Sequence, residues 1–208
     1  MPITSLGNMS VDAQGENSSL LMPKLQYRFR VRFPSGFGGG DGTAPLTKQV
    51  IDVTRPTVSF TDIPIDVYNS TVHVAGKHAW EPVTLNLRDD INHNVSKLVG
   101  KQLQSQFDFY EQSSPTSGQD YKFRMDIDVL DGGNGNTATG VLETWSLLGC
   151  YIENAAYNQL AYSASEAVTI TLSIRFDNAL QTDEQGNVTE PWTTFARTAG
   201  TLASSLAS

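Results

Sequence analysis

The three histidines, His73, His78 and His93, are the first candidates for catalysis or metal binding. A histidine-based metal site needs a second ligand at a fixed spacing, as in H-x-x-x-H or H-E-x-x-H, and no Cys or carboxylate stands at such a position. His73 and His78 flank an expected turn, and His93 stands where a helix is expected to begin. We therefore expect the three histidines to be solvent-exposed or capping residues.

The single cysteine, Cys150, lies between Leu147 and Ile152 in an apolar stretch. A buried cysteine behaves as a small hydrophobe with a raised pKa, so we expect a core residue and not a catalytic thiol. One cysteine also excludes an intramolecular disulfide, which is typical of a reducing compartment.

Two glycine-rich segments and one acidic pair could also carry chemistry. Residues 36–42 lack the Gly-Lys-Ser/Thr ending of a phosphate loop, and residues 131–136 lack the bidentate glutamate of a calcium loop, so both are expected to be mobile loops. Asp89 and Asp90 could act as an acid/base pair, but at a strand-to-helix junction they are expected to cap the helix. No nucleophile stands with its base. The sequence predicts a structural protein with no enzymatic activity, no metal and no cofactor.

The elements around these residues are mostly strands. Apolar and polar residues alternate with a period of two, which is typical of strands with one buried face. We expect about seven strands in antiparallel sheets, hence a β-sandwich or barrel. They cover residues 25–33, 48–60 with a break near Arg55-Pro56, 63–75 and 80–89 around a turn at Gly76-Lys77, 121–129, 141–152 and 168–176.

One flanking helix is expected at about residues 91–112, with Asp90 as its N-cap. Its apolar residues share one face at helical spacing. They are Ile91, Val95, Leu98, Val99, Leu103, Phe107 and Tyr110.

Length and charge limit the domain organisation and the partners. The 208 residues allow one β-sandwich domain over residues 24–178, with a flexible N-terminal arm at 1–23 and a C-terminal extension at 179–208. The net charge of −8 disfavours adhesion to nucleic acid. No apolar run reaches the length of a membrane span and residues 1–22 do not read as a secretory signal, so we expect a soluble protein made in the cytoplasm, with no membrane binding.

Two stretches of the chain resemble the tail tube proteins of contractile-tailed bacteriophages, whose fold is shared with secretion-system tube proteins. The likeness covers most of residues 24–178 and is a pattern of strands and turns. In residues 54–90 it rests on Thr54-Arg55-Pro56, Ile63-Pro64-Ile65, Val67-Tyr68-Asn69, a Val-Ala-Gly turn at residues 72–76, Trp80, Val83-Thr84-Leu85 and Asp89-Asp90. In residues 145–177 it rests on Leu148-Gly149-Cys150-Tyr151, residues 158–162, Glu166 and residues 168–172.

This resemblance implies a viral tail protein that forms hexameric rings. The rings stack into a hollow tube inside a contractile sheath and conduct the DNA genome during ejection. Implied partners are further copies of the chain, the tail sheath protein, and baseplate and tail terminator proteins; the implied location is the tail of the virion, after assembly in the host cytoplasm. Two alternatives stay open: a tube-initiating or terminator ring protein, and a monomeric β-sandwich binding module.

Candidate contacts between copies lie on the hairpin expected at residues 64–80, where apolar and polar residues alternate. They are Ile65, Val67, Tyr68, Asn69, Val72, Val74 and Trp80. Trp80 could equally fill its own subunit's core. A bore lined with carboxylates would repel DNA phosphates, and Asp126 and Asp128, on the polar face of one strand, are the candidates to line it.

Overall fold

The computed structural model describes residues 24–40, 44–132, 140–163 and 165–183. The expected N-terminal arm at residues 1–23 lies outside these ranges, as do residues 184–208 of the C-terminal extension expected at 179–208. The helices are α1 (Ala44–Gln49) and α2 (Asn94–Gln106), with 3-10 turns η2 (Phe37–Gly40) and η3 (Gly118–Asp120). The strands are β1 (Phe29–Ser35), β2 (Val50–Val53), β3 (Val58–Val67), β4 (Ser70–Trp80), β5 (Val83–Arg88), β6 (Phe123–Leu130), β7 (Val141–Tyr157), β8 (Thr169–Arg175) and β9 (Asn178–Asp183).

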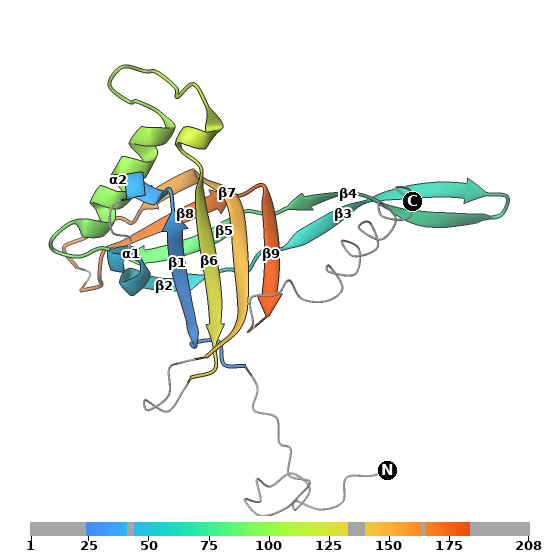
Figure 1. Ribbon diagram of the computed structural model, residues 1–208, viewed down its shortest axis with the longest axis horizontal. Coiled ribbons are helices and arrows are strands. Elements are labelled where there is room, and N and C mark those ends of the chain that lie inside the picture. The colour runs from blue at the N-terminus through green and yellow to red at the C-terminus, as the bar shows by residue number, and fades with distance from the viewer. Residues whose placement is uncertain (1–23, 41–43, 133–139, 164, 184–208) are drawn as a thin grey trace, which may run out of the picture.

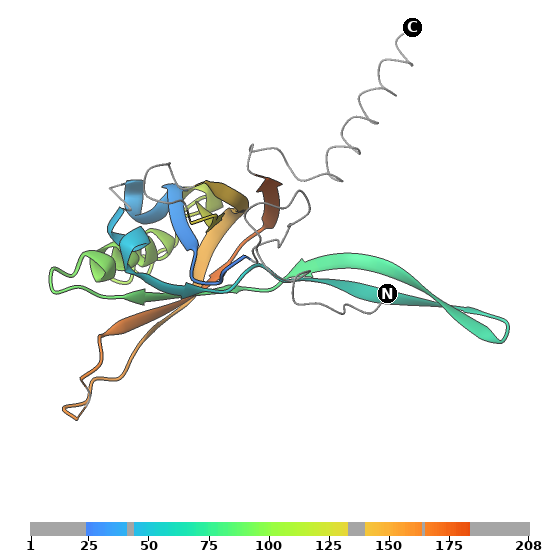
Figure 2. The same cartoon turned by 90° about the horizontal axis from the view of Figure 1, so that it is seen from below.

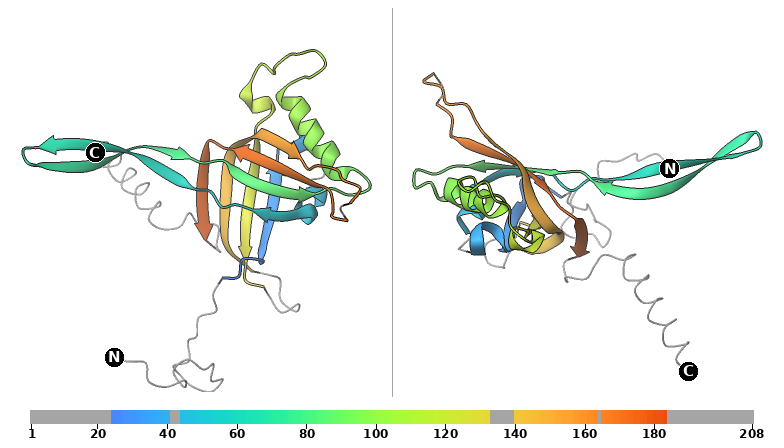
Figure 3. Two further views of the ribbon diagram at one scale, coloured as in Figure 1. Left: turned by 180° about the vertical axis from the view of Figure 1, so that it is seen from behind. Right: turned by 90° about the horizontal axis from the view of Figure 1, so that it is seen from above.

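Two sheets that share β7 form a sandwich (Figures 1 and 3). Sheet A consists of β1, β6, the first half of β7 and β9, and sheet B consists of the second half of β7, β8, β5 and β2. All neighbouring strands are antiparallel. The two helices lie on the same side of sheet B as sheet A (Figure 2). The predicted mainly-β sandwich with a flanking helix is therefore confirmed.

The alternating residues of the strands fill the core between the sheets. In β5 and β8 the register sets Leu85 opposite Leu172 and Leu87 opposite Ile170, and all four side chains are buried. Sheet A contributes Val31, Met125 and Ile127 to the same cluster. Because every second residue points inward, the polar residues between them form the outer faces of the two sheets.

Gly149 is the point at which β7 passes from sheet A to sheet B. Leu148 pairs with Asn178 of β9, whereas Tyr151 pairs with Arg175 of β8. Gly149 has a φ of +68°, in the left-handed region that glycine adopts without strain. A Cβ at this position would lie 2.2 Å from Oδ2 of Asp177.

We expect Gly149→Ala to lower the free energy of unfolding by about 1–2 kcal/mol, because alanine is strained at this φ and displaces Asp177. Asp177 also accepts a hydrogen bond from Lys122 Nζ at 2.6 Å, which the displacement would break. Urea unfolding of the purified variant measures the change. The matched control is Gly100→Ala in α2, where an added Cβ meets no atom within 4 Å. Since alanine favours a helix interior over glycine by about 1 kcal/mol, Gly100→Ala should be neutral or stabilising. Equal effects of both changes would contradict this role of Gly149.

The helix is shorter than expected, because α2 covers Asn94–Gln106 and not residues 91–112. Its buried apolar residues are Val95, Leu98 and Val99, whereas Ile91 and Tyr110 lie outside the helix and are almost fully exposed. The N-cap lies three residues later than predicted, at His93, whose backbone is in the left-handed region. Asp90 still contacts the start of the helix, because its carboxylate accepts a hydrogen bond from the Asn94 backbone amide at 2.8 Å. These contacts lower the pKa of Asp90, chiefly through the Asn94 amide hydrogen bond.

The predicted turn at Gly76-Lys77 is wrong. The chain reverses at Tyr68-Asn69, between β3 and β4, and Gly76 lies inside β4. Gly76 stands opposite a register shift in β3, where an added Cβ would lie 2.9 Å from the carbonyl oxygen of Thr61. Glycine is therefore needed for a close backbone approach and not for a turn.

Three further boundaries and one loop differ from the predictions. The stretch expected at residues 48–60 begins in α1 and not in a strand, but the predicted break near Arg55-Pro56 is confirmed, because β2 ends at Val53 and β3 begins at Val58. β1 starts at Phe29, four residues later than the alternation suggests. The glycine-rich loop contains Phe37, which is fully buried and packs against Phe33 with 4.8 Å between the ring centroids. The expected domain end at residue 178 cuts through β9, which pairs with β7 and belongs to sheet A.

Candidate assembly surfaces

The hairpin β3–β4 extends away from the sandwich as a two-stranded ribbon (Figures 1 and 2). Apart from Gly76 and Trp80, all of its residues are exposed. Two strands alone have no second layer on which to bury side chains, and an isolated hairpin is marginally stable in water. The ribbon therefore carries an uncovered surface.

The outer half of this ribbon has one apolar and one polar face. On the apolar face, Ile63 stands opposite Val74 and Ile65 opposite Val72, and the exposed fractions of Ile65 and Val72 are 48% and 50%. On the polar face, Nδ1 of His73 lies 2.8 Å from Oδ2 of Asp62, and Thr71 donates a hydrogen bond to Asp66 at 3.0 Å. Because side chains of the polar face form hydrogen bonds with one another, covering the apolar face with another surface is the change that would stabilise the ribbon.

The predicted contact residues divide into two groups. Six of them are exposed together at the outer half and tip of the hairpin: Ile65, Val67, Tyr68, Asn69, Val72 and Val74. Trp80, at the base, packs on its own subunit instead, with its ring centroid 5.6 Å from that of Phe176. Sequence reasoning missed Ile63 and Phe60 on the same ribbon, although their alternation with polar neighbours was a usable signal.

The second predicted pair, Asp126 and Asp128, lies on the outer face of sheet A under arginine side chains. Asp128 is fully buried and accepts hydrogen bonds from Arg32 Nε at 2.6 Å, Arg30 Nη2 at 2.8 Å and Thr144 Oγ1 at 2.9 Å. Asp126 is similarly buried and accepts from Arg124 Nε at 2.9 Å. Burial alone would raise the pKa of Asp128, but the hydrogen bonds from Arg32, Arg30 and Thr144 outweigh it and hold the pKa below its usual range.

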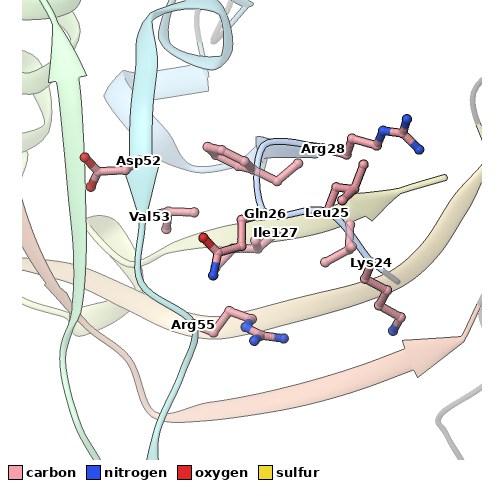
Figure 4. A pocket seen from close by; sticks show the side chains of 10 residues that line it. Lys24, Leu25, Gln26, Arg28, Asp52, Val53, Arg55 and Ile127 are labelled. Carbon is pink, nitrogen blue, oxygen red and sulfur yellow. The ribbon is translucent and has the colours of Figure 1, made fainter. Parts of the chain in front are cut away.

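A hollow opens between β1 and β2, which are the first and last strands in the order β1-β6-β7-β8-β5-β2. It consists of two depressions that share Gln26, Phe29 and Asp52, and we call it the β1–β2 hollow. Figure 4 shows one depression, where Ile127 lies beside Gln26 and the side chains of Lys24, Arg28 and Arg55 belong to the lining. The other depression is lined by Tyr27, Val31, Thr47, Val50 and Ile51.

Glu143 lies beside this hollow, nearly buried, and pairs with Lys24. It also accepts a hydrogen bond from Trp145 Nε1 at 2.7 Å. Burial alone would raise the pKa of Glu143, but the Lys24 and Trp145 hydrogen bonds, with the positive charges of Lys24 and Arg55, lower it.

The connection between β7 and β8 is a second projecting segment (Figure 2). It exposes apolar side chains that sequence reasoning did not single out as contacts, among them Tyr157 at the end of β7. The others are Leu160, Tyr162 and Val168. A register shift between Ile152 and Asn154 interrupts the alternation of β7, so the sequence pattern does not show that the strand continues to Tyr157.

Groups that could carry chemistry are dispersed or inert. Burial raises the pKa of the Cys150 thiol to about 12, which keeps it protonated. The three histidines lie apart, two on β4 and one before α2, and within the described ranges no group of His, Cys, Asp and Glu residues could hold a metal ion. No helix of the described part of the chain is long and apolar enough to span a membrane.

No protein-family model and no curated protein sequence matches the chain. Solved structures do share its fold. They include the tube-terminating cap of the anti-feeding prophage (14% identity, TM-score 0.58, 82% of this chain and 98% of that chain). A chain of the sheath/tube terminator of the extracellular contractile injection system PVC has 13% identity and a TM-score of 0.59 over 79% of this chain and 99% of that chain. A chain of the PVC sheath–tube complex has 14% identity and a TM-score of 0.55 over 79% and 94%. The fold is thus that of tube and tube-cap proteins of contractile injection systems, as the resemblance predicted.

Proposed function

We propose that this chain is a structural subunit of a contractile tail tube, in which rings of the protein stack through the β3–β4 hairpin. The observation that carries the proposal is the uncovered apolar face of that hairpin. A ribbon of this length with no core gains stability only when another surface covers it.

A second copy of the chain is the partner that fits this surface. A contact between the hairpin and a different part of an identical subunit is heterologous, and such contacts repeat into rings or open polymers. The resemblance to phage tube proteins supports six copies per ring, a surrounding sheath, and passage of a genome through the bore. Baseplate and terminator proteins would contact the two ends of the tube in the tail.

A terminator ring is the second candidate, because one of the similar structures described above is a tube-terminating cap and another is a chain of a sheath/tube terminator. In this second candidate, rings of the chain would end a stack instead of extending it. Both candidates are structural proteins, and they differ only in whether rings of this chain stack on one another.

Sedimentation velocity and negative-stain imaging of the full chain test this proposal. We expect rings with a central hole that stack into tubes as the concentration rises. Rings that never stack would favour the terminator. A stable monomer at high concentration would contradict both candidates and favour a monomeric binding module.

A further inference from the structure

The β1–β2 hollow lies at an end of the sandwich that sheet B leaves uncovered. β6 and β9 extend past β2, so the inner side of sheet A is open near their ends (Figures 1 and 3). Phe29 of β1 and Val129 of β6 stand opposite each other there, line the hollow and are only half-buried. The depression of Figure 4 has a volume of about 340 Å³. Sites of about 300–1,000 Å³ hold a whole ligand, so this depression has room for an aromatic side chain.

The chain continues from the end of β9 close to this hollow. Asp183, the last residue of β9, stands opposite Glu143 of β7, and Glu143 stands opposite Val129 of β6. Val129 in turn pairs with Phe29. Because neighbouring strands lie about 4.8 Å apart, the backbone of Asp183 is only about 10 Å from that of Val129. Residues that follow Asp183 therefore begin within reach of the hollow.

The segment after β9 carries large apolar side chains at a suitable distance along the chain. Trp192 and Phe195 are its only aromatic residues, and Trp192 stands nine positions after Asp183. Nine residues span up to about 30 Å when extended, which is more than the width of the strands that separate Asp183 from the hollow. A tryptophan at this position can therefore reach the depression without stretching the chain.

The charges of the hollow and of this segment are complementary. Arg55 lines the hollow and is exposed, and no ion pair formed within the described ranges includes it. The segment after β9 carries Glu184 and Glu190 and has no Lys or Arg before Arg197. Glu190 stands two positions before Trp192, so a tryptophan held in the hollow brings this carboxylate to the rim where Arg55 lies.

We propose that the segment after β9 folds back over the β1–β2 hollow of its own subunit, with Trp192 in the depression of Figure 4 and Glu190 beside Arg55. The hollow is then a docking site for part of the same chain, and this contact does not depend on the proposed tube function. Attachment through a short linker gives the segment an effective concentration on the order of millimolar at the hollow, which favours it over a second copy. Burying the indole ring covers the half-buried apolar side chains at the open end of the sandwich.

Acrylamide quenching of tryptophan fluorescence tests whether Trp192 docks. The chain contains three tryptophans, so the emission of Trp192 is the difference between a given chain and the same chain with Trp192→Ser. Because burying a large apolar side chain favours the docked state at least about tenfold, quenching of Trp192 should be weaker by a similar factor than in the urea-unfolded chain. Leu25→Asp places a charge in the lining of the hollow and should return the quenching to the unfolded value. Leu25 is half-buried and precedes β1, so the fold is retained, and circular dichroism checks it.

An exchange of charges tests the place of Glu190. Arg55→Glu and Glu190→Arg should each increase the quenching of Trp192 about threefold, as expected for the loss of an exposed ion pair. The variant that carries both changes should return to the unmodified value, which a general effect of either substitution on the fold would not produce. The matched control is Arg88→Glu, an exposed arginine at the other end of sheet B, and it should leave the quenching unchanged.

The outcomes distinguish the possible positions of Trp192. Equal quenching in the folded and unfolded chains would show that the segment does not dock, and protection that survives Leu25→Asp would place Trp192 outside the hollow; either result overturns the inference. Refolding Leu25→Asp copies together with Trp192→Ser copies separates the chain's own hollow from that of a neighbour. Trp192 of the Leu25→Asp copies should stay accessible, and regained protection would mean that a neighbouring copy receives it, contrary to this inference. A chain that forms no rings contradicts the tube proposal and leaves these expected results unchanged.

Discussion

Replacing Ile65 and Val72 together by serine is expected to abolish tubes while leaving rings intact. The two side chains stand opposite each other on the apolar face of the hairpin and are about half exposed. Covering the exposed half of each side chain stabilises the ring-to-ring contact by about 1 kcal/mol per side chain in each copy. Since all copies of a ring lose this contribution together, the loss per ring-to-ring interface is on the order of 10 kcal/mol for a ring of about six.

Negative-stain imaging and pelleting of polymer measure this effect, and urea unfolding checks the fold. The matched control changes the neighbouring pair on the polar face, Asp66→Ser with Thr71→Ser, and should retain tubes. Both double variants should unfold like the unmodified subunit, because the residues are exposed in it. Tubes of normal length from the Ile65/Val72 variant would remove the apolar face from the stacking contact.

The second large effect is expected at Asp128, where one carboxylate holds two arginines on the outer face of sheet A. Asp128→Asn removes the charge but keeps the shape, so Arg30 and Arg32 lose their shared partner. Removing one partner of a fully buried ion pair costs about 3–5 kcal/mol. Here both arginine side chains are more than two-fifths exposed, so water can hydrate them after the change. We therefore expect the free energy of unfolding to fall by about 2–3 kcal/mol.

The pH dependence identifies the charge as the cause. The pKa of Asp128 is lower in the folded chain than in the unfolded one, so its ionised form stabilises the fold at pH values above the unfolded pKa of about 3.9. That stabilisation is lost as the pH falls through the folded pKa. The difference between the unmodified chain and Asp128→Asn should therefore be full at pH 7 and shrink below about pH 4.

Urea unfolding from pH 7 down to pH 3 measures this difference. The control is Asp62→Asn on the exposed hairpin, where 59% of the side chain is in solvent and little change is expected. A difference that stays constant with pH would show that packing, and not the buried charge, accounts for the loss.

Local sequence patterns were enough to predict the sandwich and most of its core. Alternation in β5 and β8 identified Leu85 and Leu172 as inward residues, and the apolar stretch around Cys150 identified a buried thiol. Such inferences succeed because a strand's period of two is a local property of the backbone. The likeness to tube proteins followed from the same local patterns and agrees with the fold.

What covers each face of a strand became clear from the packing of the folded chain. Ile65 and Leu85 alternate in the same way along the chain, yet one lies on a free ribbon and the other in the core. Asp128 stands at a polar position in the alternating pattern of β6, where a surface residue is expected. Arginines of β1, a strand far away in sequence, bury it. Periodicity separates the two sides of a strand and carries no information on which of them meets another layer, because that depends on long-range pairing. The β1–β2 hollow depends on such pairing, since β1 and β2 meet only after β7 has bent from one sheet into the other.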